Sequence, residues 1–93
     1  VSSARRVAYK LISMSNLVLL TIVAEEVLAP ALEKEISELG AKGYTAYTVS
    51  GKGLTDVRDN QWEGENIKIE TIVSPEICQR ILDHLQKKYF ERY

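Results

Sequence analysis

Residues 17–24 have the sequence LVLLTIVA, and this run decides the fold. A continuous apolar run of this length, with several β-branched side chains, is typical of a central strand buried on both faces. Glu25 and Glu26 end the run. It is far shorter than the roughly 20 apolar residues that a membrane-spanning helix needs. The sequence therefore predicts a core strand, around which the other elements can be placed.

The residues after this strand predict an amphipathic helix. Pro30 suits the first helical turn, where its missing N–H costs nothing, and Gly40 suits the cap at the other end. Four apolar residues recur between them at helical spacing. They are Leu28, Leu32, Ile36 and Leu39.

The rest of the chain predicts two strands and a second helix. Residues 44–50 (YTAYTVS) and 66–73 (NIKIETIV) are rich in aromatic and β-branched side chains. Ser74 and Pro75 are a good N-cap and first residue for a helix. Its expected buried stripe is Ile77, Cys78, Ile81, Leu82, Leu85 and Tyr89. The order predicts an α+β, ferredoxin-like βαββαβ sandwich with its last strand absent or truncated.

A single domain is expected at residues 14–93, preceded by an N-terminal extension. The chain has 93 residues and a mass of 10.5 kDa, which leaves no room for two domains. Residues 1–13 carry three basic side chains and no acid, and Met14 is typical of a natural protein start. We therefore place 1–13 outside the fold. A signal peptide and a basic amphipathic anchor are the alternatives.

The composition excludes several classes of function. A net charge of −1 argues against a nucleic-acid binder, which usually carries a basic excess. One cysteine, Cys78, rules out an internal disulfide and fits a cytoplasmic, reducing compartment. One histidine, His84, rules out a multi-histidine metal site. We expect Cys78 to be a small core residue and His84 to have no catalytic role.

Two helices can cover one face of a sheet. The alternation in 44–50 and 66–73 leaves apolar and aromatic side chains on both faces of these strands. The uncovered face should therefore be buried against another subunit. The alternative is that its Tyr and Thr side chains simply tolerate water.

Residues 51–64 form a loop that is too long for an ordinary hairpin. Gly51, Lys52 and Gly53 open it, and glycines there let backbone N–H groups converge on an anion beside a lysine. Arg58 could add a fork-shaped contact to a phosphate or carboxylate. The alternative is a solvated turn. The GxxxxGK[ST] spacing of a P-loop is absent.

Other loop residues favour a docking role over chemistry. Trp62 could stack on a base, anchor a partner or fold back onto the sheet. The acidic residues do not have the spacing of an EF-hand, so we expect no metal site. They are Asp56, Asp59, Glu63 and Glu65.

The stretch GAKGYTAYTVSGKG, at residues 40–53, resembles the helix–strand–loop segment of PII signalling proteins. The similarity is greater to the PII-like proteins linked to bicarbonate transport and carboxysomes. GKGxxxVR at 51–58, NIKIE at 66–70 and KYFxxY at 88–93 share that pattern. The resemblance spans about residues 17–93.

This resemblance implies a homotrimer of ferredoxin-like subunits with ligand clefts between neighbours. The implied effector is an adenine nucleotide: ATP, ADP, AMP or cyclic AMP. Gly51, Lys52 and Gly53 match the base of the family's T-loop. Arg58 matches one phosphate-binding arginine, and Thr55 stands where relatives have another. No separate cofactor is implied.

In that family, the ligand changes the shape of the T-loop, which docks on a membrane transporter or an enzyme. Thr55, Asp56 and Trp62 are our candidates for docking. The implied protein is regulatory rather than an enzyme, and cytoplasmic or peripheral to the membrane through its partner.

Two other functions remain open on the same fold. A small acylphosphatase-like hydrolase would need a phosphate-cradling arginine and a water-positioning amide, for which Arg58 and Asn66 are candidates. A metal-handling trimer resembling the divalent-cation tolerance proteins is disfavoured by a single His and a single Cys, both on the second helix.

Overall fold

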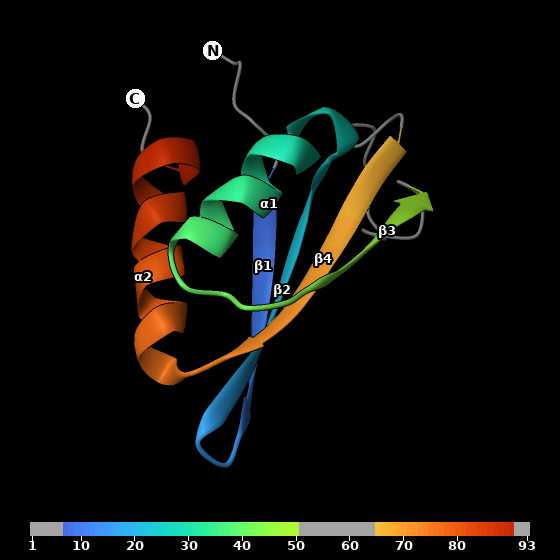
Figure 1. The fold of residues 1–93 in the computed structure, drawn as a ribbon. Helices are drawn as coiled ribbons and strands as arrows, with labels where there is room; N and C mark the ends of the chain where they lie inside the picture. The colour runs from blue at the N-terminus through green and yellow to red at the C-terminus, as the bar shows by residue number, and fades with distance from the viewer. Residues whose placement is uncertain (1–6, 51–64, 91–93) are drawn as a thin grey trace.

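A computed structural model describes residues 7–50 and 65–90 of the chain. Its elements are β1 (Val7–Met14), β2 (Leu17–Glu25), the 3-10 turn η1 (Glu26–Leu28), α1 (Ala29–Glu38), β3 (Thr45–Ser50), β4 (Glu65–Val73), α2 (Pro75–Leu85) and the π-helical turn η4 (Gln86–Phe90). Figure 1 shows both helices packed against one twisted sheet.

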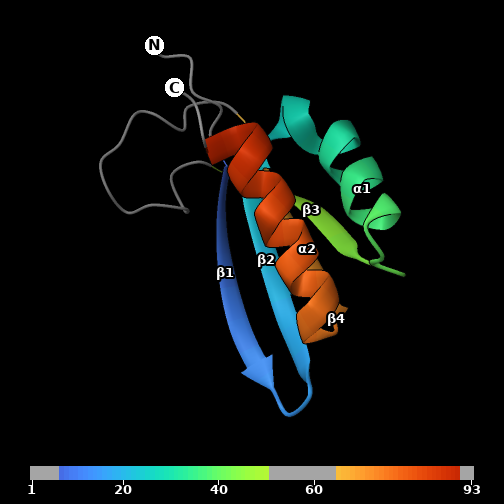
Figure 2. The same ribbon diagram turned by 90° about the vertical axis from the view of Figure 1, so that its left-hand side faces the viewer.

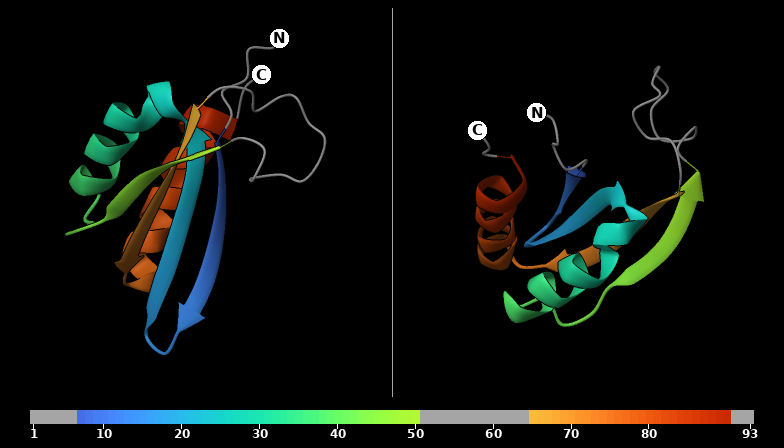
Figure 3. Two further views of the ribbon diagram at one scale, coloured as in Figure 1. Left: turned by 90° about the vertical axis from the view of Figure 1, so that its right-hand side faces the viewer. Right: turned by 90° about the horizontal axis from the view of Figure 1, so that it is seen from above.

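The sheet has the order β1-β2-β4-β3, and every neighbouring pair is antiparallel. β2 therefore has a strand on each side, as the apolar run at 17–24 predicts. Figures 2 and 3 show α1 and α2 on the same face of the sheet. This confirms the predicted ferredoxin-like sandwich with helices on one face.

β1 corrects the expectation that residues 1–13 lie outside the fold. Residues 7–14 pair with β2 in one unbroken register, from Val7 opposite Ala24 to Met14 opposite Leu17. The physical reason is the free edge of β2, whose backbone groups need partners that an adjacent extended segment can supply. The sheet's fourth strand thus comes from before β2 rather than from after α2. Residues 1–6 lie outside the described part.

The ends of both helices follow from local chemistry. Gly40 ends α1 with a φ of +123°, and its N–H donates to the carbonyl of Ser37 at 3.2 Å. A Cβ at this position would lie 2.9 Å from Cδ1 of Ile77, so glycine is needed for both backbone angle and space. At the start of α2, Ser74 Oγ accepts the N–H of Ile77 at 3.2 Å, and Pro75 follows as the first helical residue.

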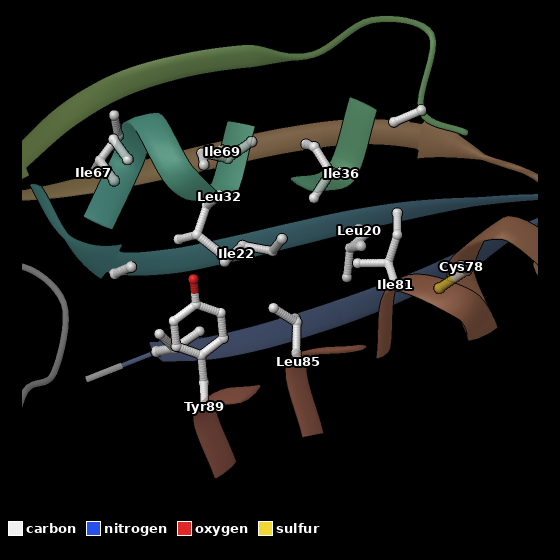
Figure 4. Packing of buried hydrophobic residues seen from close by; sticks show 14 of the residues in the cluster. Leu20, Ile22, Leu32, Ile36, Ile67, Ile69, Cys78, Ile81, Leu85 and Tyr89 are labelled. Atoms are coloured by element: carbon white, nitrogen blue, oxygen red, sulfur yellow. The ribbon is translucent and has the colours of Figure 1, made fainter. Parts of the chain in front are cut away.

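The core lies between the sheet and the two helices (Figure 4). Its large, fully buried apolar side chains come from both helices and the two central strands. They are Leu20, Ile22, Leu32, Ile36, Ile69, Ile81 and Leu85. Cys78 is also buried, as predicted, and burial raises the pKa of its thiol.

The opposite side of the sheet, here called the open face, is covered by no helix of the described chain. Register places the following side chains on it: Ala8, Lys10, Ile12, Leu19, Thr21, Val23, Thr45, Tyr47, Lys68, Glu70 and Ile72. Leu19 and Val23 are half-buried. Thr21 is buried on this face, so the prediction that β2 is buried on both faces is met in part within one chain.

Candidate functional site

The base of the long loop is defined by the last pair of the β3–β4 ladder. Ser50 and Glu65 are directly opposite each other, so the chain leaves and re-enters the sheet at adjacent positions. The predicted anion-binding and docking residues of the loop lie outside the described residues and stay predictions. They are Gly51, Lys52, Gly53, Thr55, Asp56, Arg58 and Trp62.

Asn66 lies next to this base, with Glu25 and Val49 opposite it on the two neighbouring strands. Its side chain is completely buried. An amide that positions a hydrolytic water must reach the substrate. The burial of Asn66 therefore argues against its pairing with Arg58 in an acylphosphatase-like site.

A hollow of about 360 Å³ lies at the other end of the sheet, and we call it the distal hollow. It is formed by the start of β3, the end of β4 and one residue of β2. Its lining residues are Leu19, Gly43, Tyr44, Thr45, Glu70, Thr71 and Ile72.

Two hydrogen bonds hold the wall of the distal hollow. Thr71 Oγ1 donates to the carbonyl oxygen of Gly43 at 2.6 Å, and the Tyr44 hydroxyl donates to Glu33 Oε1 at 3.3 Å. Desolvation and the nearby Glu33 carboxylate raise the pKa of the Tyr44 phenol, so it remains a neutral donor at neutral pH. The segment between α1 and β3 is thus attached both to β4 and to α1.

The lining of the distal hollow combines apolar walls with hydrogen-bond acceptors. Leu19 and Ile72 supply the apolar surface, while Thr45 and Glu70 supply a hydroxyl and a carboxylate. Apolar walls with a few polar groups are typical of sites for small molecules. The sequence analysis missed the hollow, because Thr45 and Glu70 become neighbours through the register of β3 and β4, which alternation within each strand does not give.

A second hollow, of about 380 Å³, lies in the middle of the open face. It shares Leu19 and Glu70 with the distal hollow and extends to Ile12 of β1. The ammonium of Lys68 lies 5.8 Å from the ring centre of Tyr47 beside it. Apolar surface therefore continues across the face from one hollow to the other, with charged side chains among it.

A charged cluster joins the two helices on the other side of the sheet. Glu35 of α1 accepts a hydrogen bond from the Tyr89 hydroxyl at 3.1 Å and another from the Lys88 ammonium. His84 Nε2 lies 3.1 Å from Glu35 Oε1, within ion-pair distance although not aligned as a hydrogen bond. Burial raises the pKa of Glu35, but its contacts with Lys88, His84 and Tyr89 outweigh this and hold the pKa below its usual value.

The sequence analysis missed this cluster because its members are far apart in the chain. Glu35 and Tyr89 are separated by 54 positions. The π-helical turn η4, which includes both Lys88 and Tyr89, was also not predicted. The cluster attaches α1 to the end of α2, which is a structural role.

Two absences among the described residues bear on other functions. Within 7–50 and 65–90, no group of three His, Cys, Asp or Glu side chains is arranged to hold a metal ion. Over the same ranges, no helix is long and apolar enough to cross a membrane.

Comparison with known proteins identifies the family. The family model for nitrogen regulatory protein P-II matches residues 17–93. The chain belongs to the P-II family. A crystal structure of a protein described as a PII-like signalling protein, from Thermus thermophilus, is 51% identical in sequence. The alignment covers 77% of this chain and 72% of that one, with a TM-score of 0.63.

The P-II match confirms the resemblance carried by residues 40–53 and includes every element from β2 onward. It begins after β1, which ends at Met14. The open face, the distal hollow and the loop base thus lie largely on the part of the chain that this P-II protein shares with its family.

Proposed function

We propose that this P-II protein is a signalling protein that binds a small anionic effector between neighbouring copies of the chain. The effector is an adenine nucleotide: ATP, ADP, AMP or cyclic AMP. The bound nucleotide changes the conformation of the loop at 51–64. The loop then docks on a membrane transporter or an enzyme, or releases it. The observation that carries this proposal is the P-II match together with a strand hairpin that has a long loop at one end and a hollow at the other.

The length of β4 supports a site shared by two copies. Glu65 begins the strand at the loop base, and Thr71 lines the distal hollow six residues later. At about 3.3 Å per residue these positions are about 20 Å apart, which exceeds the reach of one nucleotide. The proposal is that a ligand in the distal hollow takes its phosphate contacts from the loop of a second copy.

The chemistry of the distal hollow suits an adenine ring. Leu19 and Ile72 are cross-strand neighbours that can together pack against one face of the ring, and the Glu70 carboxylate can accept a hydrogen bond from its exocyclic amine. Gly51, Lys52, Gly53 and Arg58 then supply phosphate contacts from the neighbouring loop. Thr55, Asp56 and Trp62 contact the regulated partner.

The open face supports assembly into a homotrimer. Ile12, Tyr47 and Ile72 each expose more than two fifths of their surface in the single chain. Exposed apolar area of this kind favours burial against a second copy. Such packing would also bring the hollow of one copy toward the loop of the next.

Native mass spectrometry with each of the four nucleotides tests the proposal. We expect a trimer that takes up to three molecules of at least one nucleotide. Arg58→Ala should weaken nucleotide binding about tenfold or more and leave the trimer intact, because it removes a charge-assisted hydrogen bond to phosphate. Arg80→Ala, at an exposed position of α2, is the matched control and should bind as the unmodified protein does.

Three outcomes would contradict the proposal. A trimer that binds none of the nucleotides would remove the effector, and an Arg58→Ala protein that binds as tightly as Arg80→Ala would remove the loop from the site. Hydrolysis of acyl phosphate that depends on Arg58 would instead favour an enzyme on the same fold.

A further inference from the structure

The distal hollow lies where the β3–β4 ladder stops. The last pair at this end is Thr45 opposite Glu70, whereas β4 continues to Val73 and stays paired with β2 as far as that residue. If the ladder continued, Gly43 would lie opposite Ile72. Both residues instead line the hollow, so the hollow lies at the edge position that the chain leaves before Thr45. The contacts that keep Gly43 away from this position therefore determine the shape of the hollow.

The hydroxyl of Thr71 holds Gly43 on the helix side of the sheet. Alternation along β4 directs Ile69, Thr71 and Val73 toward the helices, and Thr71 is 3% exposed. Its Oγ1 donates to the carbonyl oxygen of Gly43 at 2.6 Å, a short distance for a hydroxyl donor. Residues 41–44 belong to no helix or strand. A side-chain hydrogen bond thus takes the place of a ladder hydrogen bond in this segment.

Tyr44 supplies a second attachment of the same segment. Its hydroxyl donates to Glu33 Oε1 of α1 at 3.3 Å, in an exposed contact. Two consecutive residues are therefore held in different directions, Gly43 to β4 and Tyr44 to α1. The hydrogen bond of Thr71 is the shorter and the more buried of the two, so we expect it to contribute more to the position of the segment.

We propose that Thr71 is a positioning residue for the effector site, because its hydroxyl fixes Gly43 and thereby the wall of the distal hollow before a nucleotide binds. This inference rests on the proposed function, in which the nucleotide is the ligand of the hollow. A wall that is already in place does not have to be ordered at the moment of binding. Without the hydroxyl, the Gly43 carbonyl loses its partner, the wall loosens and the affinity falls.

Substitutions of Thr71 that differ in the hydroxyl test this role. Thr71→Val removes the hydroxyl at nearly constant volume, whereas Thr71→Ser keeps it. Calorimetric titration with ATP, ADP, AMP and cyclic AMP should show that Thr71→Val binds about fivefold more weakly, as expected for one lost hydrogen bond, and that Thr71→Ser stays within about twofold of the unmodified protein. Thr48→Val is the matched control. Thr48 lies opposite Ile67 on the helix side of β3, does not line the hollow and should tolerate the change.

A purely structural role would give a different pattern. Thr71→Ser loses a buried methyl group and therefore some stability, which urea unfolding measures. Affinity that follows the hydroxyl, and not the free energy of unfolding, identifies positioning. If Thr71→Val does not fold, Thr71→Ala replaces it, since Thr71→Ala and Thr71→Ser both lose the methyl group and differ in the hydroxyl. Equal affinities within the pair that folds would overturn the proposal.

Hydrogen exchange without any nucleotide tests the same hydrogen bond independently of a ligand. In Thr71→Val the amides of residues 41–45 should exchange several-fold faster than in the unmodified protein, while those of α1 keep their rates. Thr71→Ser should restore slow exchange. Equal exchange rates in the three proteins would overturn the proposal whatever the protein binds.

The unmodified protein separates this inference from the proposed function. If it binds a nucleotide and Thr71→Val binds that nucleotide equally tightly, the positioning role is wrong and the proposed function stands. If it binds none of the four nucleotides, the proposed function fails and the effector role of Thr71 fails with it, even where exchange shows a loosened wall.

Discussion

Glu35 is the residue that connects α1 with the end of α2. Its side chain is 14% exposed and meets an ammonium, an imidazole and a phenol. The hydrogen bond to Glu35 raises the pKa of Lys88, and burial together with the Glu35 charge raises the pKa of Tyr89. Both partners thus keep the proton with which they hold the carboxylate. The ionised form of Glu35 is the one that stabilises the helix pair.

Glu35→Gln should make stability less dependent on acid pH. The folded-state pKa of Glu35 lies below its usual value of 4.5, so its contribution is complete above that value and is lost as pH falls through the folded-state pKa. We expect the substitution to lower the free energy of unfolding at pH 7 by about 1–2 kcal/mol, as for other hydrogen bonds to charged groups. Urea unfolding at pH values from 7 to 3 measures both effects.

The control is Glu38→Gln, in the same helix. Glu38 is 65% exposed and pairs with Lys34 at 3.8 Å, so its loss should change stability by less than about 0.5 kcal/mol. If the Glu35→Gln protein lost stability on acidification as steeply as the unmodified protein, the proposed charge contribution would be wrong.

At the scale of elements, β1 and β2 contribute unequally to the fold although they pair along their whole length. Leu11 and Leu20 are direct cross-strand neighbours, yet Leu20 is fully buried under the helices and Leu11 is 43% exposed. The difference arises because β2 has a strand on each side and helices above it, whereas β1 is an edge strand. Backbone pairing alone does not make a strand part of the core.

Alanine substitutions at these two leucines should separate pairing from packing. Leu20→Ala should lower the free energy of unfolding by about 2–5 kcal/mol, because it leaves a cavity in the core. Leu11→Ala should cost less, about 1 kcal/mol, because 43% of the residue's surface is already in water and no core cavity forms. Urea unfolding at neutral pH measures both. Equal losses would show that β1 carries as much of the core as β2.

The sequence predicts these elements where the signal is local. Gly40 and the Ser74-Pro75 pair mark helix ends through contacts within a few residues, and the apolar run at 17–24 marks the strand between β1 and β4. The sequence analysis did not predict β1, because an edge strand buries few side chains. The distribution of apolar residues along 7–14 therefore does not distinguish a strand from an appended segment. The contacts of the Glu35 cluster span 49 to 54 positions in the sequence, which the periodicity of a single helix does not reveal.

The candidate site was predictable to a smaller extent than the fold. The P-II resemblance of residues 40–53 directed attention to the loop, whose residues remain predictions. The distal hollow required knowledge of register, because Thr45 and Glu70 become neighbours when β3 and β4 pair. A site formed between two copies cannot be derived from strand periodicity within one chain.

At the scale of the whole molecule, the open face determines whether the protein works alone or as an assembly. In the single chain Ile72 is 54% exposed, and it lines the distal hollow. A charge at this position remains in water if the chain is a monomer. In an assembled trimer the same charge would be desolvated without a partner, which strongly opposes association.

Ile72→Asp should therefore dissociate the assembly and leave each chain folded. The matched control is Val27→Asp, because Val27 is 78% exposed and lies in η1, away from the open face. We expect native mass spectrometry to show a trimer for the unmodified and Val27→Asp proteins and a monomer for Ile72→Asp. Circular dichroism should show the same helix and strand content in all three. A trimeric Ile72→Asp protein would exclude the open face as the interface, and a monomeric unmodified protein would remove the shared effector site along with it.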